Sequence, residues 1–411
     1  MGRQQQPLEH RLLLTATFCL LAGGAVMVYS ASSARTLLQG QGDGTMYLVK
    51  YVGYGFFGLI AMYTISRLRL DLIRRYTSLL LMAAFVMLVM VKIPGLGVEV
   101  NGATRWLGFG PLQFQPSEIV KLALVLHVAA VIAERPKIAR NIRTVVGPVI
   151  AVGGGAVLLI AAQPDLGTCL VICFTMAVLL VIAGLPMRQL GLVAGIGAVL
   201  VMLFALFEPY RRARLVSFLD PWAHATTDGF QSTQGQIAIG SGGLFGNGLG
   251  QSIQKIFYVP EAHTDFILTI IGEELGLIGI VGLLSLYGII AYAGLQTAKK
   301  AKGIYATLVA AGITSLILCQ ALLNVYAILG LAPLTGVPLP FISSGSTSLI
   351  TLMASMGVLL NVASGGHAHR LNSVPQRSKD ARDRAAQDRH SGRGDSRARS
   401  AGDSRRRRAA G

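Results

Sequence analysis

The sequence predicts an all-α polytopic membrane protein with ten membrane-spanning helices. Of its 411 residues, 53% are hydrophobic and 13% are charged. Apolar runs close to the ~20 residues that cross a bilayer recur along the chain. Lys and Arg gather in every second connection between these runs, as they do in loops on the cytoplasmic side. The predicted spans are residues 12–31, 46–66, 76–93, 116–133, 144–162, 166–185, 189–207, 265–294, 304–328 and 343–363.

The first run, 12–31, resembles a signal peptide in its position. No small-residue cleavage site follows it cleanly and more spans come after it, so it is interpreted as the first helix. The basic connections and basic termini predict that both ends of the chain are cytoplasmic. This organisation gives a cytoplasmic N-terminus at 1–11, a membrane domain at 12–364 and a cytoplasmic tail at 365–411.

The tail contains thirteen Lys or Arg and five Asp, with almost no large apolar residues. Such a composition cannot bury enough apolar surface to fold, so the tail is predicted to be disordered. A basic segment after a membrane helix more often meets anionic lipid headgroups than nucleic acid, and we expect membrane lipid as its contact. The four cysteines all lie inside apolar runs, which indicates neither a disulfide framework nor a zinc site.

The connection between the seventh and eighth spans, residues 208–265, is predicted to lie outside the cell. Its length indicates a function, and its aromatic and aliphatic residues argue against disorder. Arginines near its start oppose the topological trend, and either a solvated turn or contact with anionic headgroups or phosphates explains them. The glycine-rich run IAIGSGGLFGNGLGQS predicts a backbone that turns sharply or lies close to a ligand.

Charged residues also mark the other outer segments. Glu118 and Lys121 are i, i+3 neighbours at the start of span 116–133, so they can pair as a functional or a structural pair. Asp165 and Asp265 lie near helix starts, where capping and a role in an outer cleft are both open. The Pro-rich segment before the last span is non-helical at membrane depth, so it should line protein or water. We expect four outer segments to converge around one cavity.

The eighth span contains further unusual residues. Gly272, Gly276 and Gly279 fall on one helical face, which predicts close approach of a neighbouring helix. Glu273 and Glu274 lie within lipid depth, so they need partners that the sequence does not name.

Several long motifs occur in order along the chain: NGATRWLGFGPLQFQPSEIVK, QPDLGT, DGFQSTQGQIAIGSGGLFGNGLGQSIQK, PEAHTDFI, GEELGLIG and TGVPLPFISSGS. On these motifs, residues 10–365 resemble the SEDS family of bacterial cell-wall proteins, of the FtsW, RodA and SpoVE type. The segment QKIFYVPEAHTDFI is more similar to FtsW than to RodA.

The resemblance implies a peptidoglycan glycosyltransferase that polymerises lipid II at the outer face of the cytoplasmic membrane, for septal wall synthesis in cell division. It also implies a class B penicillin-binding protein, a transpeptidase, and other division proteins as partners. The family's essential acid is the Asp of the HTDF motif, which corresponds to Asp265. Glu118 and Lys121 match a functionally sensitive pair of the family.

Glycosyl transfer from a lipid diphosphate needs a base for the acceptor hydroxyl, and positive charge or a divalent metal where the diphosphate leaves. We predict Asp265 as the general base, with a divalent cation, Mg²⁺ or Mn²⁺, as a candidate cofactor. The residues predicted to contact substrate or diphosphate are Lys121, Glu118, Arg214, Arg211, Arg105, Lys255 and His263, with Asp165, Ser343 and Gly345 as further candidates.

Two other functions suit parts of this pattern. Ten helices with intramembrane charges and broken outer loops would also serve a lipid II flippase, although alternating access favours a site near the midplane of the bilayer. A non-catalytic division scaffold, with the basic tail as a docking arm, is the third interpretation.

Overall fold

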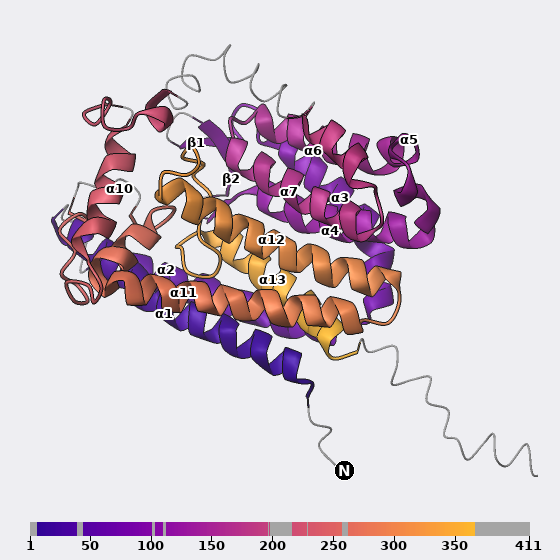
Figure 1. Cartoon of the computed structure of the whole chain (residues 1–411), viewed down its shortest axis with the longest axis horizontal. Coiled ribbons are helices and arrows are strands. Elements are labelled where there is room, and N and C mark those ends of the chain that lie inside the picture. The colour runs from indigo at the N-terminus through magenta and orange to yellow at the C-terminus, as the bar shows by residue number, and fades with distance from the viewer. Residues whose placement is uncertain are drawn as a thin grey trace, which may run out of the picture. The chain divides into compact units, whose positions relative to one another are not determined.

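The computed structural model describes residues 6–38, 44–100, 103–109, 112–195, 197, 216–227, 229–256 and 262–365. In this part of the chain, seven helices are long and apolar enough to cross a membrane (Figure 1). They are α1 (Leu8–Leu38), α2 (Met46–Arg67), α3 (Leu70–Met90), α4 (Pro116–Glu134), α11 (Ile267–Lys300), α12 (Ile304–Ile328) and α13 (Ser346–Ala363). Each overlaps a predicted span, so the polytopic character of the chain is confirmed.

The other three predicted spans do not each form one long helix among the described residues. Span 144–162 is divided among α5 (Ile142–Val145), the π-helical η2 (Val146–Ile150) and α6 (Ala151–Ala161), after a 3₁₀ turn η1 (Pro136–Arg140). Span 166–185 corresponds to α7 (Leu166–Ile182). Residues 187–195 are helical, but most of span 189–207 lies outside the described residues.

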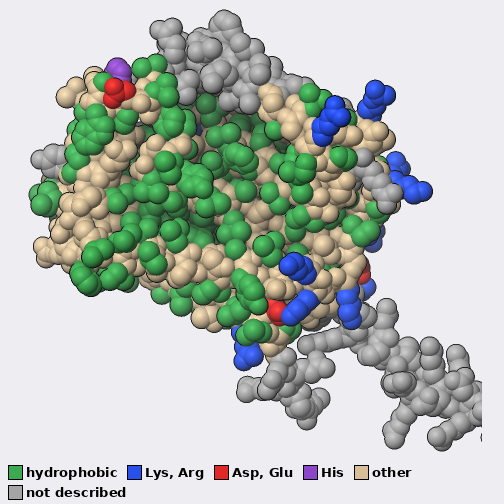
Figure 2. Space-filling view, in the orientation of Figure 1, with side chains coloured by type: hydrophobic (Ala, Val, Ile, Leu, Met, Phe, Trp, Pro, Cys, Tyr) green, Lys and Arg blue, Asp and Glu red, His purple; other side chains and the backbone are tan. Residues whose placement is uncertain are grey.

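The helices pack around α4, α12 and α13, which are the most buried of the candidate spans. α12 contacts α11, α7 and α4, while α13 packs mainly on α2, and α1 packs on α11. Outward-facing positions carry large apolar side chains such as Phe56, Phe57 and Tyr63 of α2. Figure 2 shows hydrophobic side chains across the middle of one face and Lys and Arg side chains along its rim. Apolar side chains outside as well as inside are what a lipid environment requires.

The prediction of an all-α fold is wrong for the segment between α3 and α4. This segment forms a three-stranded antiparallel sheet of β1 (Gly97–Val100), β2 (Ala103–Phe109) and β3 (Leu112–Phe114). Val98 pairs with Trp106, and Leu107 pairs with Phe114. The Thr, Trp and Phe residues of β2 favour strands. The fold is therefore mostly helical, with one small sheet beside the start of α4.

A Pro-rich segment, residues 331–345, connects α12 to α13 without helical structure. Its carbonyl groups need donors because the surroundings are apolar. Four side chains from α12, α11 and α2 supply them: Gln320 to Pro338 (3.0 Å), Asn324 to Val337 (2.8 Å), Tyr287 to Pro340 (2.6 Å) and Tyr51 to Phe341 (2.5 Å). The segment is thus a fixed part of the interior.

α11 is interrupted at Gly276, where φ is 67° and ψ is −163°. The interruption frees backbone groups on both sides, and a glycine run, residues 242–250, provides their partners. Four backbone hydrogen bonds cross between them: Asn247 N to Glu273 O (2.9 Å), Gly248 N to Glu274 O (3.0 Å), Leu277 N to Gly243 O (3.0 Å) and Ile278 N to Leu244 O (3.2 Å). The connection before α11 is therefore clamped onto the broken helix by its own backbone.

This clamp explains why glycines occur at these positions. A Cβ on Gly246 would lie 2.2 Å from the carbonyl oxygen of Glu274, and one on Gly276 would lie 2.4 Å from the amide nitrogen of Gly246. The predicted close approach at the glycines of the eighth span is real for Gly276, but the neighbour is the glycine run and not another spanning helix. The run follows α10 (Phe230–Ser241), which also packs on α11.

We predict that Gly276→Ala lowers the free energy of unfolding by about 2 kcal/mol or more, because it combines a positive φ with a backbone clash. Gly282→Ala is the matched control in the same helix, since a Cβ there meets no atom within 4 Å. Denaturation of the purified protein in detergent measures both. Equal stability of the two variants would contradict the clamp.

Candidate active site

The predicted pair of Glu118 and Lys121 forms in the first turns of α4. The α4 helix begins at Pro116, which suits a first helical position. Lys121 Nζ lies 2.8 Å from Glu118 Oε1, and the two side chains are only 2% and 3% exposed. A buried ion pair of this kind needs further hydrogen bonds to offset its desolvation. The predicted pairing is confirmed, and the further hydrogen bonds of Lys121 connect it to α12.

Two amides on α12 connect this pair to the Pro-rich segment. Lys121 Nζ also donates to Gln320 Oε1 at 2.9 Å, and Gln320 in turn donates to the Pro338 carbonyl. One helical turn further along α12, Asn324 Nδ2 donates both to Val337 O (2.8 Å) and to Asp265 O (2.7 Å). The ion pair, the Pro-rich segment and the backbone of the predicted catalytic residue are thus joined through one face of α12.

Asp265 lies two residues before α11 and is half-buried. The N-cap position of the helix belongs to Phe266, so Asp265 precedes the first turn in which it was predicted. Its Oδ1 accepts a hydrogen bond from Thr264 Oγ1 at 3.2 Å. A Cβ on Gly336 would lie 3.8 Å from Asp265 Oδ2, so the carboxylate faces the Pro-rich segment.

Asp165 caps α7, as one of its two interpretations predicted. Its carboxylate accepts hydrogen bonds from the Thr168 amide (3.1 Å) and the Thr168 hydroxyl (2.9 Å). It also accepts from Gln115 Nε2 at 3.3 Å. Two residues further along the chain, a Cβ on Gly167 would lie 2.5 Å from the carbonyl oxygen of Thr335. The start of α7 therefore lies against the same Pro-rich segment, while the cavity predicted between the four outer segments stays a prediction.

Arg105, on β2, reaches the turn between α6 and α7. Its Nε donates to Gln163 O at 3.0 Å, and a terminal nitrogen donates to Pro164 O. Gln163 itself donates to Leu88 O at 3.0 Å. Arg105 thus fixes the turn that carries Asp165, and its predicted contact with substrate stays a prediction.

Lys255 belongs to a second buried cluster. Its Nζ lies 2.9 Å from Glu274 Oε1, with exposures of 4% and 0% for the two side chains. Glu274 also accepts from the Ser30 hydroxyl of α1 at 2.7 Å. Glu273 accepts from Ser252 Oγ and from Ile253 N (2.9 Å). The partners that the sequence left unnamed are therefore residues 252 and 253 just after the glycine run, α1 and Lys255. The predicted substrate contact of Lys255 stays a prediction.

The remaining candidates are parts of the same region or lie outside it. The His263 ring is 4.3 Å from the Tyr47 ring, and its carbonyl accepts from the Ser344 hydroxyl at 2.8 Å. Ser343 Oγ accepts from Leu339 N at 2.8 Å, and Gly345 is the N-cap of α13. Arg211 and Arg214 lie outside the described residues.

A bound divalent cation is not tested by this geometry. Within the ranges that the structure describes, no group of three or more His, Cys, Asp or Glu side chains is arranged to hold a metal ion. Hydrogen bonds along α12 and the Pro-rich segment connect the backbone of Asp265 to the buried Lys121. A half-buried carboxylate that can take a proton suits acid–base chemistry.

The fold and this region define a multi-pass membrane protein whose polar residues gather where several helices begin. The model of the family described as "Cell cycle protein", FTSW_RODA_SPOVE, matches residues 10–367. The chain belongs to this family, as the motifs indicated.

Two curated relatives match over nearly their full length. The chain is 39% identical to "Stage V sporulation protein E" of Bacillus subtilis over 355 residues, covering 86% of this chain and 96% of that protein. It is 37% identical to "Probable peptidoglycan glycosyltransferase FtsW" of Thioalkalivibrio sulfidiphilus over 372 residues, covering 89% and 91%.

Two solved structures share the fold. One is a chain of "Structural coordination of polymerization and crosslinking by a peptidoglycan synthase complex", with a TM-score of 0.70, 28% identity and coverage of 86% of this chain and 97% of that chain. The other is the rod shape determining protein RodA of Thermus thermophilus, with a TM-score of 0.63, 28% identity and coverage of 86% and 96%.

We predict that Asn324→Leu lowers the glycosyltransferase activity for which the FtsW relatives are named, because Asp265 O and Val337 O each lose a donor. The matched control is Asn361→Leu on α13, which removes two similar bonds to carbonyls at the far end of α2, those of Ile65 and Leu68. Both variants should lose about 1–3 kcal/mol of stability per orphaned carbonyl. Only Asn324→Leu should lose activity per folded molecule, and equal losses would contradict a positioning role.

Proposed function

We propose that this protein polymerises lipid II into glycan strands at the outer face of the cytoplasmic membrane, with Asp265 as the general base. The protein is a peptidoglycan glycosyltransferase, in agreement with the names of its FtsW relatives. The observation that carries the proposal is the connection of Asp265 to the Glu118 and Lys121 pair through the Pro-rich segment and α12.

The proposed topology has ten spans with both termini in the cytoplasm. The alternation of basic connections supports this orientation. Glu118 lies in the first turn of α4, Asp165 at the N-cap of α7 and Asp265 just before α11. In the proposed orientation all three helix starts face outward, so the active site opens where lipid-linked precursor is presented. The septum is the proposed location, supported by the FtsW relatives.

The proposed chemistry follows from the charges in this region. Asp265 takes the proton from the acceptor sugar's 4-hydroxyl as that oxygen attacks the donor sugar's anomeric carbon, and the lipid diphosphate leaves. Positive charge stabilises the diphosphate as its bond breaks. Lys121 is buried and its charge is matched by Glu118, so it contributes through the groups that it orders. Arg105, which is half-buried, and the arginines 211 and 214 are the proposed direct contacts, and Mg²⁺ or Mn²⁺ is a further candidate.

A class B penicillin-binding protein is the proposed partner. The structural neighbour in a peptidoglycan synthase complex supports an assembly that joins polymerisation with crosslinking. The flippase alternative gains little from the geometry, because the candidate residues lie at helix starts and alternating access favours the midplane.

We predict that Asp265→Asn lowers polymerisation of labelled lipid II by about 10²–10⁴-fold, since the amide cannot accept the proton. The measurement uses the full chain reconstituted in liposomes with its transpeptidase, and glycan products are separated on gels. Asp220→Asn, an exposed carboxylate of the same outer connection, is the control. Unchanged polymer from Asp265→Asn would exclude the general base, and movement of lipid II between leaflets without any polymer would favour a flippase.

We also predict that the paired variant Lys121→Met with Glu118→Gln folds but polymerises at least about tenfold more slowly, because Gln320, which positions the Pro-rich segment, loses the hydrogen bond from Lys121. The single variant Lys121→Met should instead lose about 3–5 kcal/mol of stability, since it leaves a buried carboxylate unpaired. Thermal unfolding and the same gel assay separate the two effects. Full activity of the folded paired variant would show that the pair is only structural.

A further inference from the structure

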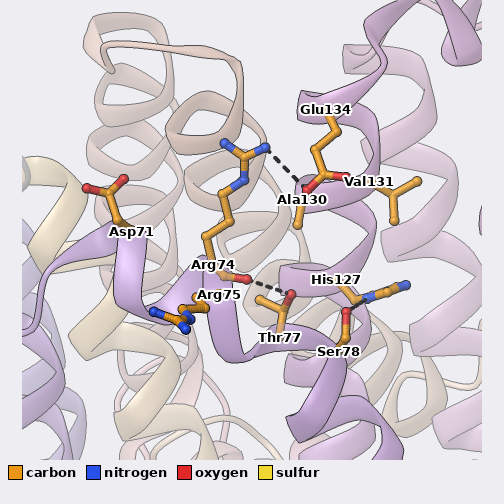
Figure 3. Close-up of a pocket in the computed structure, with 9 residues that line it drawn as sticks. All are labelled: Asp71, Arg74, Arg75, Thr77, Ser78, His127, Ala130, Val131 and Glu134. Atoms are coloured by element: carbon orange, nitrogen blue, oxygen red, sulfur yellow. Dashed lines mark hydrogen bonds and ion pairs between the residues drawn. The ribbon is translucent and has the colours of Figure 1, made fainter.

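A cavity of about 380 Å³ lies between α3 and α4, away from the proposed active site. Figure 3 shows its lining, which comes from the first turns of α3 and the last turns of α4. Along α4 the distance from Glu118 to Glu134 is about 24 Å at 1.5 Å per residue. The cavity therefore lies at the opposite end of the helices from Asp265, whichever way the protein is oriented in the membrane.

The lining of the cavity is polar, although it lies at a depth where these helices would contact lipid acyl chains in a membrane. Ser78 lies about 12 Å along α3 from Leu70, and His127 lies about 10 Å from the end of α4 at Glu134. The Ser78 hydroxyl and His127 Nδ1 are 3.4 Å apart and face one another in Figure 3. Ser78 is exposed and His127 is half-buried. Polar groups at this depth require a polar neighbour.

The charges around the cavity leave one cation available. Arg69 pairs with Asp71 at 3.9 Å and Arg74 with Glu134 at 3.6 Å. Both distances exceed those of ordinary N–H···O bonds, so these guanidinium groups retain donors. Among the described residues, Arg75 makes no ion pair. Arg69 lies outside the lining but pairs with Asp71, so Arg75 is the lining cation without a carboxylate partner among the described residues, and it can hold a singly charged anion.

An apolar stripe continues from the cavity along α3. Its members are large exposed side chains spaced three or four residues apart: Leu72, Tyr76, Leu79, Met82, Val86 and Val89. In a membrane these side chains face acyl chains. A ligand that combines a singly charged phosphate with acyl chains would therefore match the cavity and the stripe together.

We infer that this cavity binds the phosphodiester headgroup of a glycerophospholipid from the leaflet opposite the active site. Arg74 and Arg75 bind the phosphate oxygens, Ser78 and His127 donate to the deeper part of the headgroup, and one acyl chain lies along the stripe. Arg74 is already held by Glu134 and lies 5.6 Å from the Tyr305 ring, so α3, α4 and α12 meet at this ligand. Headgroup binding would join these three helices independently of catalysis.

Native mass spectrometry of the delipidated full chain tests the inference by titration with palmitoyl-oleoyl phosphatidylglycerol. One lipid should bind above background, and the double variant Arg74→Gln with Arg75→Gln should weaken that first binding about tenfold or more. Arg143→Gln is the control, because Arg143 is an exposed arginine outside the cavity lining. Equal thermal unfolding midpoints would show that the variants are folded.

Two further ligands separate the sources of phosphate. Monogalactosyl diacylglycerol has acyl chains without phosphate and should bind no more tightly to the unmodified protein than to the double variant. Inorganic phosphate at millimolar concentration should not displace the phospholipid. Equal binding of phosphatidylglycerol and the galactolipid, or an unchanged affinity in the double variant, would overturn the inference. Binding of inorganic phosphate without binding of lipid would show that the cavity binds free phosphate and would overturn the inference of a lipid ligand.

Discussion

Backbone groups that leave a helix inside a bilayer need hydrogen-bond partners from the protein itself, and the arrangement around the Pro-rich segment and the break in α11 depends on meeting that need. The Pro-rich segment receives donors from α2, α11 and α12. The break at Gly276 receives its partners from the glycine run. Asp265 lies between these two irregular pieces and is bonded to one of them through Asn324. The position of the proposed base is thus set by contacts that first serve the backbone.

Three of the buried carboxylates among the described residues play different parts. Glu118 pairs within its own helix, so its contribution is local until Lys121 reaches α12. Glu274 joins α1, α11 and the outer connection through Ser30 and Lys255. Glu273 is held by a hydroxyl and backbone amides of that connection. Burying such groups rarely adds net stability, but it penalises any other placement of the connection, because each carboxylate would lose its partners.

Features that are local in sequence could be predicted, and those that depend on distant contacts could not. Hydropathy places the long helices because span length is a property of consecutive residues, and the i, i+3 spacing predicts the ion pair of α4. The sheet of β1–β3 could not be predicted, because its segment is short and rich in glycine and because its strands pair across turns. The partners of Glu274 lie 19 and 244 residues away. The family motifs nevertheless mark the glycines of the clamp without showing what they contact.

The clamp at Gly276 has a consequence for how the molecule is made. The glycine run is synthesised before α11, so its partners in the clamp do not yet exist when the run has been made. The clamp can therefore close only after the chain has been extended past Gly276. Once closed, it turns the chain between the run and the break, which includes Asp265, into a loop fixed at both ends by backbone bonds.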